Sequence, residues 1–188
     1  NPTMNHLLRS LLILLVVACF PLAGFAQLVP AEYAGLLNGK SGKEQIDILD
    51  SIAYDARKTD APLAITMLKA AIRLSIEHSI DTAEIQERMN LNRQYRFAGK
   101  TDSAMLQVDS ALALAEKDPA LNEWRAEILS AKGVLLTRVG LYDDATAVFL
   151  KGIELAKSIK DTATLAMLNR QWAIVYFYTT DFTSAIER

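Results

Sequence analysis

The sequence has 188 residues, of which 51% are hydrophobic and 22% are charged. That composition is typical of a chain that buries a core and excludes a disordered one. The formal net charge of -2 provides no excess of basic residues to attract nucleic acid or an anionic membrane surface. We therefore expect a folded domain that does not bind nucleic acid.

The first 26 residues have the order of a secretory signal peptide. A short polar and basic start at Met4 precedes an apolar run at residues 11–17, and small residues precede a cleavage site after Ala26. Pro21 interrupts the apolar run before it reaches the roughly 20 residues that a membrane-spanning helix needs. We interpret residues 1–3 as an extension upstream of Met4, and we expect export with cleavage after Ala26.

Residues 16–19, Val-Val-Ala-Cys, support an alternative, because they resemble a bacterial lipoprotein box. In that case Cys19 would be lipidated and would become the mature N-terminus. Cleavage after Ala26 would instead remove the only cysteine, leaving neither disulfides nor thiolate metal sites. The mature N-terminal residue, Cys19 or Gln27, distinguishes the two.

Residues 27–43 contain Pro30 and three glycines and have weak periodicity, so we expect a linker or lead-in there. An internal repeat follows over residues 44–188. Its anchors are four alanines at steps of 40, 41 and 40 residues: Ala64, Ala104, Ala145 and Ala185. A polar turn precedes each anchor, with the last turn at residues 180–184. Asp, Ser and Thr in such turns can accept hydrogen bonds from the first N–H groups of a helix.

Apolar residues follow each anchor at helical spacing, and a second helical pattern precedes it, so each unit is predicted to be helix, turn, helix. These units resemble the tetratricopeptide repeat, a helix pair with small residues where the helices cross. The third unit, about residues 126–159, carries the pattern most fully, at Leu129, Gly133, Leu136, Gly140, Tyr142, Ala145, Phe149 and Gly152. The other units are about residues 45–78, 85–118 and 166–188, the last of them incomplete.

The proline that usually closes the second helix is absent, so the helices can run about one turn longer, which would lengthen the period from about 34 to about 40 residues. The resemblance implies an all-α fold, a right-handed α-solenoid of antiparallel helix pairs that is truncated at its C-terminal end. Exported arrays of this long-period type resemble the sensor regions of bacterial histidine kinases and related regulators.

We therefore expect a protein–protein interaction scaffold in the periplasm or cell envelope, acting in signal transduction and tethered to the membrane only through its signal peptide or a later transmembrane helix. One alternative is a lipid-anchored nutrient-capture or assembly lipoprotein with the same scaffold. Another is the N-terminal part of a sensor histidine kinase whose catalytic domain lies beyond residue 188.

Motifs for catalysis are missing from the sequence: it has no glycine-rich phosphate loop, no His-Glu-x-x-His, no Gly-x-Ser-x-Gly and no cysteine pair. We expect no catalytic residue, cofactor or metal in this segment. His78 is the only histidine after the signal peptide, and we interpret it as a surface residue.

Binding residues are expected on the first helix of each pair, since those helices line the concave face of such arrays. The candidates are Arg93, Arg96, Phe97, Val134, Thr137, Arg138, Arg170, Ile174, Phe177 and Tyr178. This basic and aromatic set suggests a groove that binds an acidic or carboxylate-bearing polypeptide segment. The guanidinium groups would orient the segment, and the aromatic rings would supply apolar contact area. The competing interpretation places the arginines on solvated helix surface and packs Phe177 and Tyr178 against a further helix. We assign Trp172 to the core.

Overall fold

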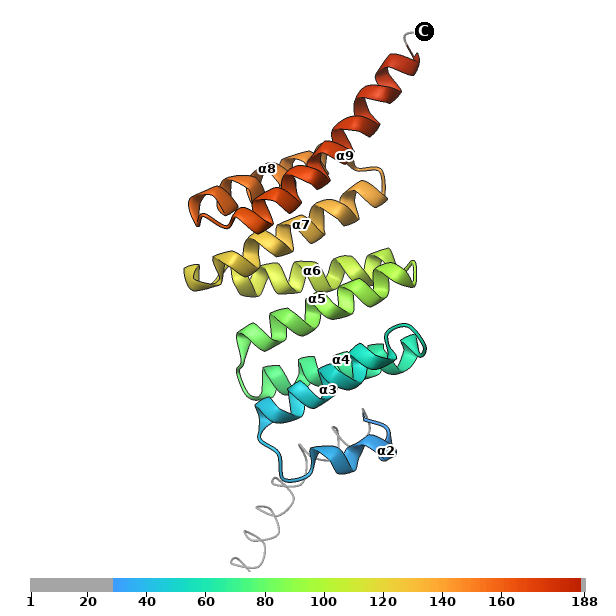
Figure 1. Cartoon of the computed structure of the whole chain (residues 1–188), viewed down its shortest axis with the longest axis vertical. Coiled ribbons are helices and arrows are strands. Elements are labelled where there is room, and N and C mark those ends of the chain that lie inside the picture. The colour runs from blue at the N-terminus through green and yellow to red at the C-terminus, as the bar shows by residue number, and fades with distance from the viewer. Residues whose placement is uncertain (1–28, 187–188) are drawn as a thin grey trace, which may run out of the picture. The chain divides into compact units, whose positions relative to one another are not determined.

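The computed structural model describes residues 29–186, with side chains up to residue 179 (Figure 1). The predicted signal peptide and Cys19 lie outside these residues. In the part described, the chain forms eight α-helices and no strand, so the predicted all-α fold is confirmed. The chain divides into two compact units, Asn1–His78 and Ser79–Arg188, which we describe separately. None of the described helices is both long and apolar enough to cross a membrane.

The first unit contains α2 (Ala31–Ala34), the 3-10 turn η1 (Gly35–Leu37), α3 (Gly42–Ala56) and α4 (Ala61–Glu77). The stretch expected to be a linker is therefore partly helical. Val29 and Leu37 are each only 4% exposed, and η1 contacts α3. Burial of these two apolar side chains explains why residues 29–37 are folded, although the glycines and proline of residues 27–43 predicted a linker.

Hydrogen-bonding side chains fix the starts of α3 and α4. Ser41 and Glu44 form a reciprocal capping box, in which the Ser41 N–H donates to Glu44 Oε2 at 2.8 Å. The hydrogen bond from the Ser41 backbone lowers the pKa of Glu44 below its ordinary value. At α4, the Leu63 N–H donates to Asp60 Oδ1 at 3.0 Å, and Pro62 occupies the first turn, where its missing N–H costs nothing.

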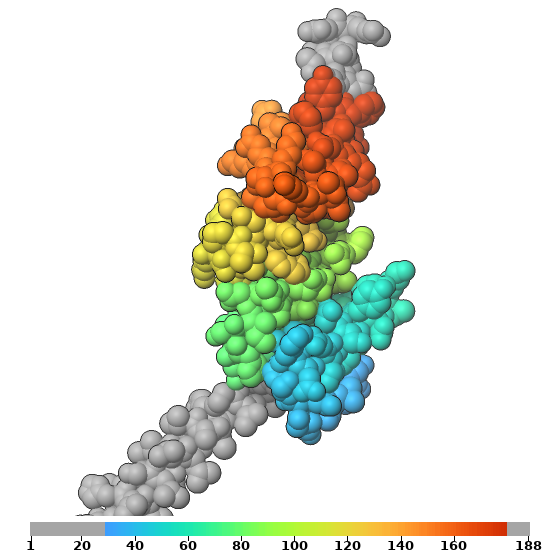
Figure 2. All heavy atoms as spheres, turned by 60° about the vertical axis from the view of Figure 1, so that its left-hand side comes forward, coloured from blue at the N-terminus to red at the C-terminus, as the bar shows by residue number. Residues whose placement is uncertain are grey.

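The second unit is a series of five helices, each in contact with the next: α5 (Asp81–Phe97), α6 (Thr101–Ala115), α7 (Asn122–Arg138), α8 (Tyr142–Ser158) and α9 (Thr162–Ile186). A 3-10 turn, η2 (Pro119–Leu121), leads into α7. The helices α7 and α9 also contact each other, although α8 separates them in sequence. Figure 2 shows α7, α8 and α9, coloured yellow to red, packed closely together.

Two of the turns in this unit use glycine with positive φ, Gly99 at +71° and Gly140 at +80°. An L side chain rarely adopts that conformation, so these positions end α5 and α7 in the way a helix C-terminus commonly ends. The turn predicted at residues 180–184 is wrong, because α9 runs through it without interruption to Ile186. That segment, Thr-Asp-Phe-Thr-Ser, offers no glycine to stop the helix.

The core of the second unit is built around Phe149 of α8, which is fully buried. Ala145, Ile153, Leu168 and Val175 share its cluster, and Trp172 packs against it, as expected for a core residue. The repeat anchors Ala64, Ala104 and Ala145 are each 0% exposed. Small residues at these points let neighbouring helices approach closely.

Candidate functional site

Two neighbouring hollows lie along α5, α7 and α9 in the second unit. The smaller one, the polar hollow, measures about 210 Å³ and is lined by Met89, Asn92, Arg93, Arg96, Glu127, Ser130, Ala131, Val134, Met167 and Gln171. The larger one, the aromatic hollow, measures about 460 Å³ and is lined by Val134, Thr137, Arg138, Tyr142, Gln171, Ile174 and Tyr178. Both are bordered by Val134 and Gln171, so we treat them together as one groove.

Helical periodicity explains why these residues share one surface. On α5, the lining positions are spaced i, i+3, i+4 and i+7 from Met89, so they lie on one face of the helix. On α9, Met167, Gln171, Ile174 and Tyr178 follow the same rule. The groove is therefore made by one continuous stripe on each of three helices that are not consecutive in the sequence.

Positive charge is concentrated where α5 and α7 end. Arg138 Nη1 donates a hydrogen bond to the backbone oxygen of Arg96 at 2.7 Å, across 42 residues of sequence. This carbonyl, in the last turn of α5, also accepts the Gly99 N–H at 3.2 Å, so the guanidinium group adds a second hydrogen bond to it. Burial lowers the pKa of Arg96 below its ordinary value, and the nearby charges of Arg138 and Arg93 lower this pKa further.

Among the side chains that the structure describes, these three guanidinium groups have no carboxylate partner. None of the ion pairs among the side chains described, up to residue 179, includes Arg93, Arg96 or Arg138. The lining residues contain a single acidic side chain, that of Glu127. Like charges at close range raise the free energy of the unliganded protein, and an anion placed among them would lower it.

The polar hollow also contains a buried acceptor without a donor. Asn92 is only 3% exposed, and within the described part of the chain its Oδ1 has no hydrogen-bond partner. Leaving such an acceptor unsatisfied costs about 1–3 kcal/mol. A ligand that offers an N–H group at this point would recover that energy.

Aromatic rings form one wall of the aromatic hollow. The rings of Tyr142 and Tyr178 stack with centroids 6.4 Å apart and planes at 16°. Phe177 meets the Tyr178 ring edge-on, with centroids 6.1 Å apart. The Tyr178 residue is 50% exposed, so its ring offers apolar area to a ligand in addition to its contacts within the protein.

Seven of the ten predicted binding residues line the groove: Arg93, Arg96, Val134, Thr137, Arg138, Ile174 and Tyr178. The other three, Phe97, Arg170 and Phe177, line neither hollow, and Phe97 is 77% exposed. Asn92 and Gln171 were missed, although each lies within four residues of a predicted residue on the same helix face. Tyr142 could not be found from the predicted first helices alone, because it begins α8, which the repeat pattern predicts to be a second helix.

Residues for metal binding do not come together in the part of the chain that the structure describes: no group of three or more His, Cys, Asp or Glu side chains is placed to hold an ion. His78 is exposed, in the first unit, and its ring lies against Gly42.

No protein-family model matches the sequence, and no match is found among proteins of curated function. The functional assignment therefore depends on the chemistry of the groove.

Proposed function

We propose that this chain is a protein-interaction module whose groove binds an acidic or carboxylate-bearing polypeptide segment. The observation that carries the proposal is the cluster of Arg93, Arg96 and Arg138, which lie close enough for their charges to affect one another and which have no carboxylate partner among the described side chains. Guanidinium groups bind carboxylates through paired, charge-assisted hydrogen bonds, so such a cluster favours acidic side chains over other partners.

The two adjoining hollows differ in chemistry, so they would fix the orientation of a bound peptide. An acidic side chain fits the polar hollow beside Arg93 and Arg96, and an apolar or aromatic side chain fits against Tyr142 and Tyr178 in the aromatic hollow. The backbone between them would pass Val134 and Gln171, which border both hollows, and an N–H group within the polar hollow could donate to Asn92 Oδ1 on α5. The segment is therefore extended and carries its acidic and apolar residues at separate positions.

We further propose that the helices form a tetratricopeptide-like, right-handed array. Support comes from Ala64, Ala104 and Ala145, which recur at steps of 40 and 41 residues and are each fully buried. The signal-peptide-like composition of residues 1–26 supports export and a binding or sensing role in the cell envelope.

Peptide binding measured by fluorescence anisotropy tests the groove. One labelled peptide carries two glutamates near a tyrosine, and its counterpart carries glutamines in their place. We expect the acidic peptide to bind the purified protein at least roughly tenfold more tightly, and we expect Arg93→Glu/Arg96→Glu to remove that preference.

The matched control is Lys117→Glu/Lys157→Glu, which changes net charge equally at exposed positions outside the groove. We expect it to retain the preference. Equal loss in both variants would show a response to net charge alone, and equal binding of the two peptides would remove the basis of the proposal.

A further inference from the structure

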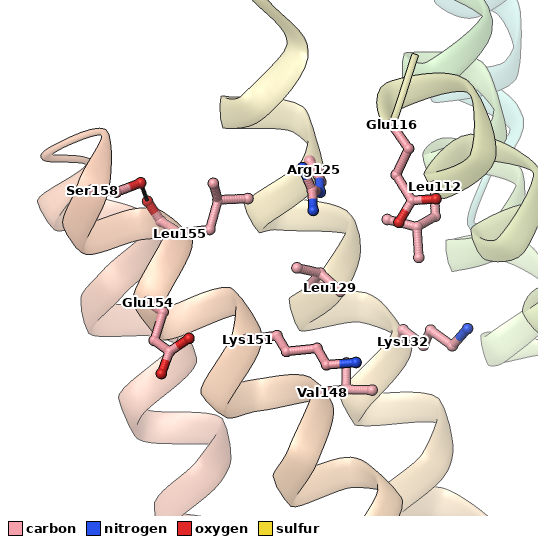
Figure 3. A pocket seen from close by; sticks show the side chains of 10 residues that line it. All are labelled: Leu112, Glu116, Arg125, Leu129, Lys132, Val148, Lys151, Glu154, Leu155 and Ser158. Atoms are coloured by element: carbon pink, nitrogen blue, oxygen red, sulfur yellow. Dashed lines mark hydrogen bonds between the residues drawn. The ribbon is translucent and has the colours of Figure 1, made fainter. Parts of the chain in front are cut away.

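A separate hollow of about 570 Å³ lies between α6, α7 and α8 (Figure 3). The α7 residues that line it are Arg125, Leu129 and Lys132, at i, i+4 and i+7. Successive helical residues are rotated by about 100°, so this set points away from the α7 residues of the groove, such as Ser130 and Val134. The helix α7 therefore presents opposite faces to two different cavities.

Aliphatic side chains from three helices line part of this hollow: Leu112 of α6, Leu129 of α7, and Val148 and Leu155 of α8. The other lining residues are charged or polar: Glu116, Arg125, Lys132, Lys151, Glu154 and Ser158. Its volume is in the range of sites that hold small organic molecules, and such sites combine apolar walls with a few polar groups that fix orientation. The apolar body of a small ligand would therefore be covered from three helices.

Arg125 supplies the polar group. Figure 3 shows its side chain between Leu155 and Leu112, above Leu129. Its Nε is buried and, among the residues that the structure describes, has no acceptor. A buried N–H group without an acceptor is destabilising, and one of a charged side chain more so than a neutral one.

Neighbouring charges restrict what could supply the acceptor. Lys132 is already engaged by Asp109, with 2.8 Å between Nζ and Oδ1. The exposed carboxylates of Glu116 and Glu154 lie at opposite edges of the hollow, and neither forms an ion pair with Arg125. The two glutamates offset the positive charges of Arg125 and Lys151, which also line the hollow. The hollow therefore has no excess positive charge that would favour an anion with two or more charges, such as phosphate or a dicarboxylate, over a monoanion.

We propose that this hollow is a binding site for a small aliphatic monocarboxylate. The carboxylate accepts hydrogen bonds from Nε and one terminal nitrogen of Arg125 in the paired geometry of guanidinium and carboxylate groups. The hydrocarbon chain lies against Leu112, Leu129, Val148 and Leu155. This site is distinct from the groove, and the proposal does not rest on the proposed peptide ligand.

Isothermal titration calorimetry with four probes tests this site: hexanoate, acetate, hexan-1-ol and phosphate. Hexanoate is expected to bind at least roughly tenfold more tightly than acetate, which lacks the chain, and than hexan-1-ol, which lacks the charge. Phosphate is expected not to bind. Equal affinity for hexanoate and hexan-1-ol, equal affinity for hexanoate and acetate, or no hexanoate binding would each overturn the proposal.

Two variants locate the site. Arg125→Met keeps much of the side-chain volume and is expected to weaken hexanoate binding by roughly tenfold. Lys151→Glu replaces a positive with a negative charge at an exposed position of the rim and leaves the buried residues intact. We expect it to lower the affinity for hexanoate and to leave the affinity for hexan-1-ol unchanged. Arg170→Met removes the same charge at an exposed position of α9 that lines neither the groove nor this hollow, and as the control it should leave hexanoate binding unchanged. An effect of Arg170→Met equal to that of Arg125→Met would place the ligand elsewhere.

Discussion

The ring of Phe149 on α8 occupies the space that a side chain at Gly133 on α7 would need. A Cβ atom at Gly133 would lie 2.4 Å from Phe149 Cε1 and 2.6 Å from Cζ. Phe149 is fully buried and is surrounded by the other side chains of its core cluster. The close approach of α7 and α8 therefore depends on this glycine.

Gly133→Ala should lower the free energy of unfolding by about 1–3 kcal/mol, the usual cost of overpacking a core. Alanine favours a helix over glycine by about 1 kcal/mol, which offsets only part of this cost. Urea unfolding followed by circular dichroism measures the change. Gly35→Ala is the control, because a Cβ there meets nothing within 4 Å. A Gly133→Ala protein at least as stable as the original would contradict the close packing.

Combining Gly133→Ala with Phe149→Leu should restore part of the loss, since the smaller side chain makes room for the new methyl group. In a double-mutant cycle the two changes should therefore couple by more than about 0.5 kcal/mol. Strict additivity would show that the two residues do not compete for the same space.

Gly140 holds a φ of +80° in the turn between α7 and α8, and a Cβ there meets nothing within 4 Å. Gly140→Ala should therefore destabilise the protein through backbone strain alone, by about 1–2 kcal/mol. Gly140→Asn should cost less, because asparagine tolerates this conformation better than alanine. Thermal unfolding of the two variants compares them, and an equal effect would argue against strain as the cause.

Asp161 precedes α9 and accepts a hydrogen bond from the Thr164 N–H at 3.0 Å. Hydrogen bonds from the side chain and backbone of Thr164 lower the pKa of Asp161 below its ordinary value. A carboxyl with a depressed folded-state pKa adds stability above its unfolded pKa of about 4, and this stability is lost as the pH falls through the folded value. Asp161→Ala should thus lower the melting temperature clearly at pH 7 and less below about pH 3. A difference independent of pH would show that the charge of the cap is not involved.

Arg93 contributes positive charge next to Arg96. Within the described part of the chain, its side chain makes a single long hydrogen bond, 3.4 Å from Nη1 to Asn90 Oδ1. Arg93→Gln should therefore leave the free energy of unfolding unchanged or slightly raised, because it relieves repulsion between like charges in the free protein. The same change should lower the affinity for the acidic peptide severalfold. Chemical unfolding and anisotropy on the same sample compare the two effects. Parallel loss of stability and binding would instead indicate that Arg93 has a structural role.

Local chemistry explains which parts of the fold could be predicted. The repeat at Ala64, Ala104 and Ala145 depends on small residues at helix contacts, and the cap at Asp60 depends on a hydrogen bond to a residue three positions away. Such signals are visible in sequence because cause and effect are close together. The turns before α6 and α8 were expected to cap these helices in the same way, but no side chain caps either helix.

Features that depend on distant neighbours could not be predicted in the same way. Residues 29–37 are folded because Val29 and Leu37 are buried. Tyr142 belongs to the groove because its ring stacks on that of Tyr178, 36 positions later. The unsatisfied Arg125 becomes visible only when α6 and α8 are placed around it. In each case the deciding contact joins segments that sequence periodicity treats independently.

Because α7 borders the groove on one side and the aliphatic hollow on the other, any displacement of this helix alters the shape of both cavities at once. A ligand that displaced α7 on filling one cavity would therefore change the free energy of filling the other. Such a coupling would be symmetrical: the factor by which a bound carboxylate changed the affinity for the peptide would be the factor by which the bound peptide changed the affinity for the carboxylate.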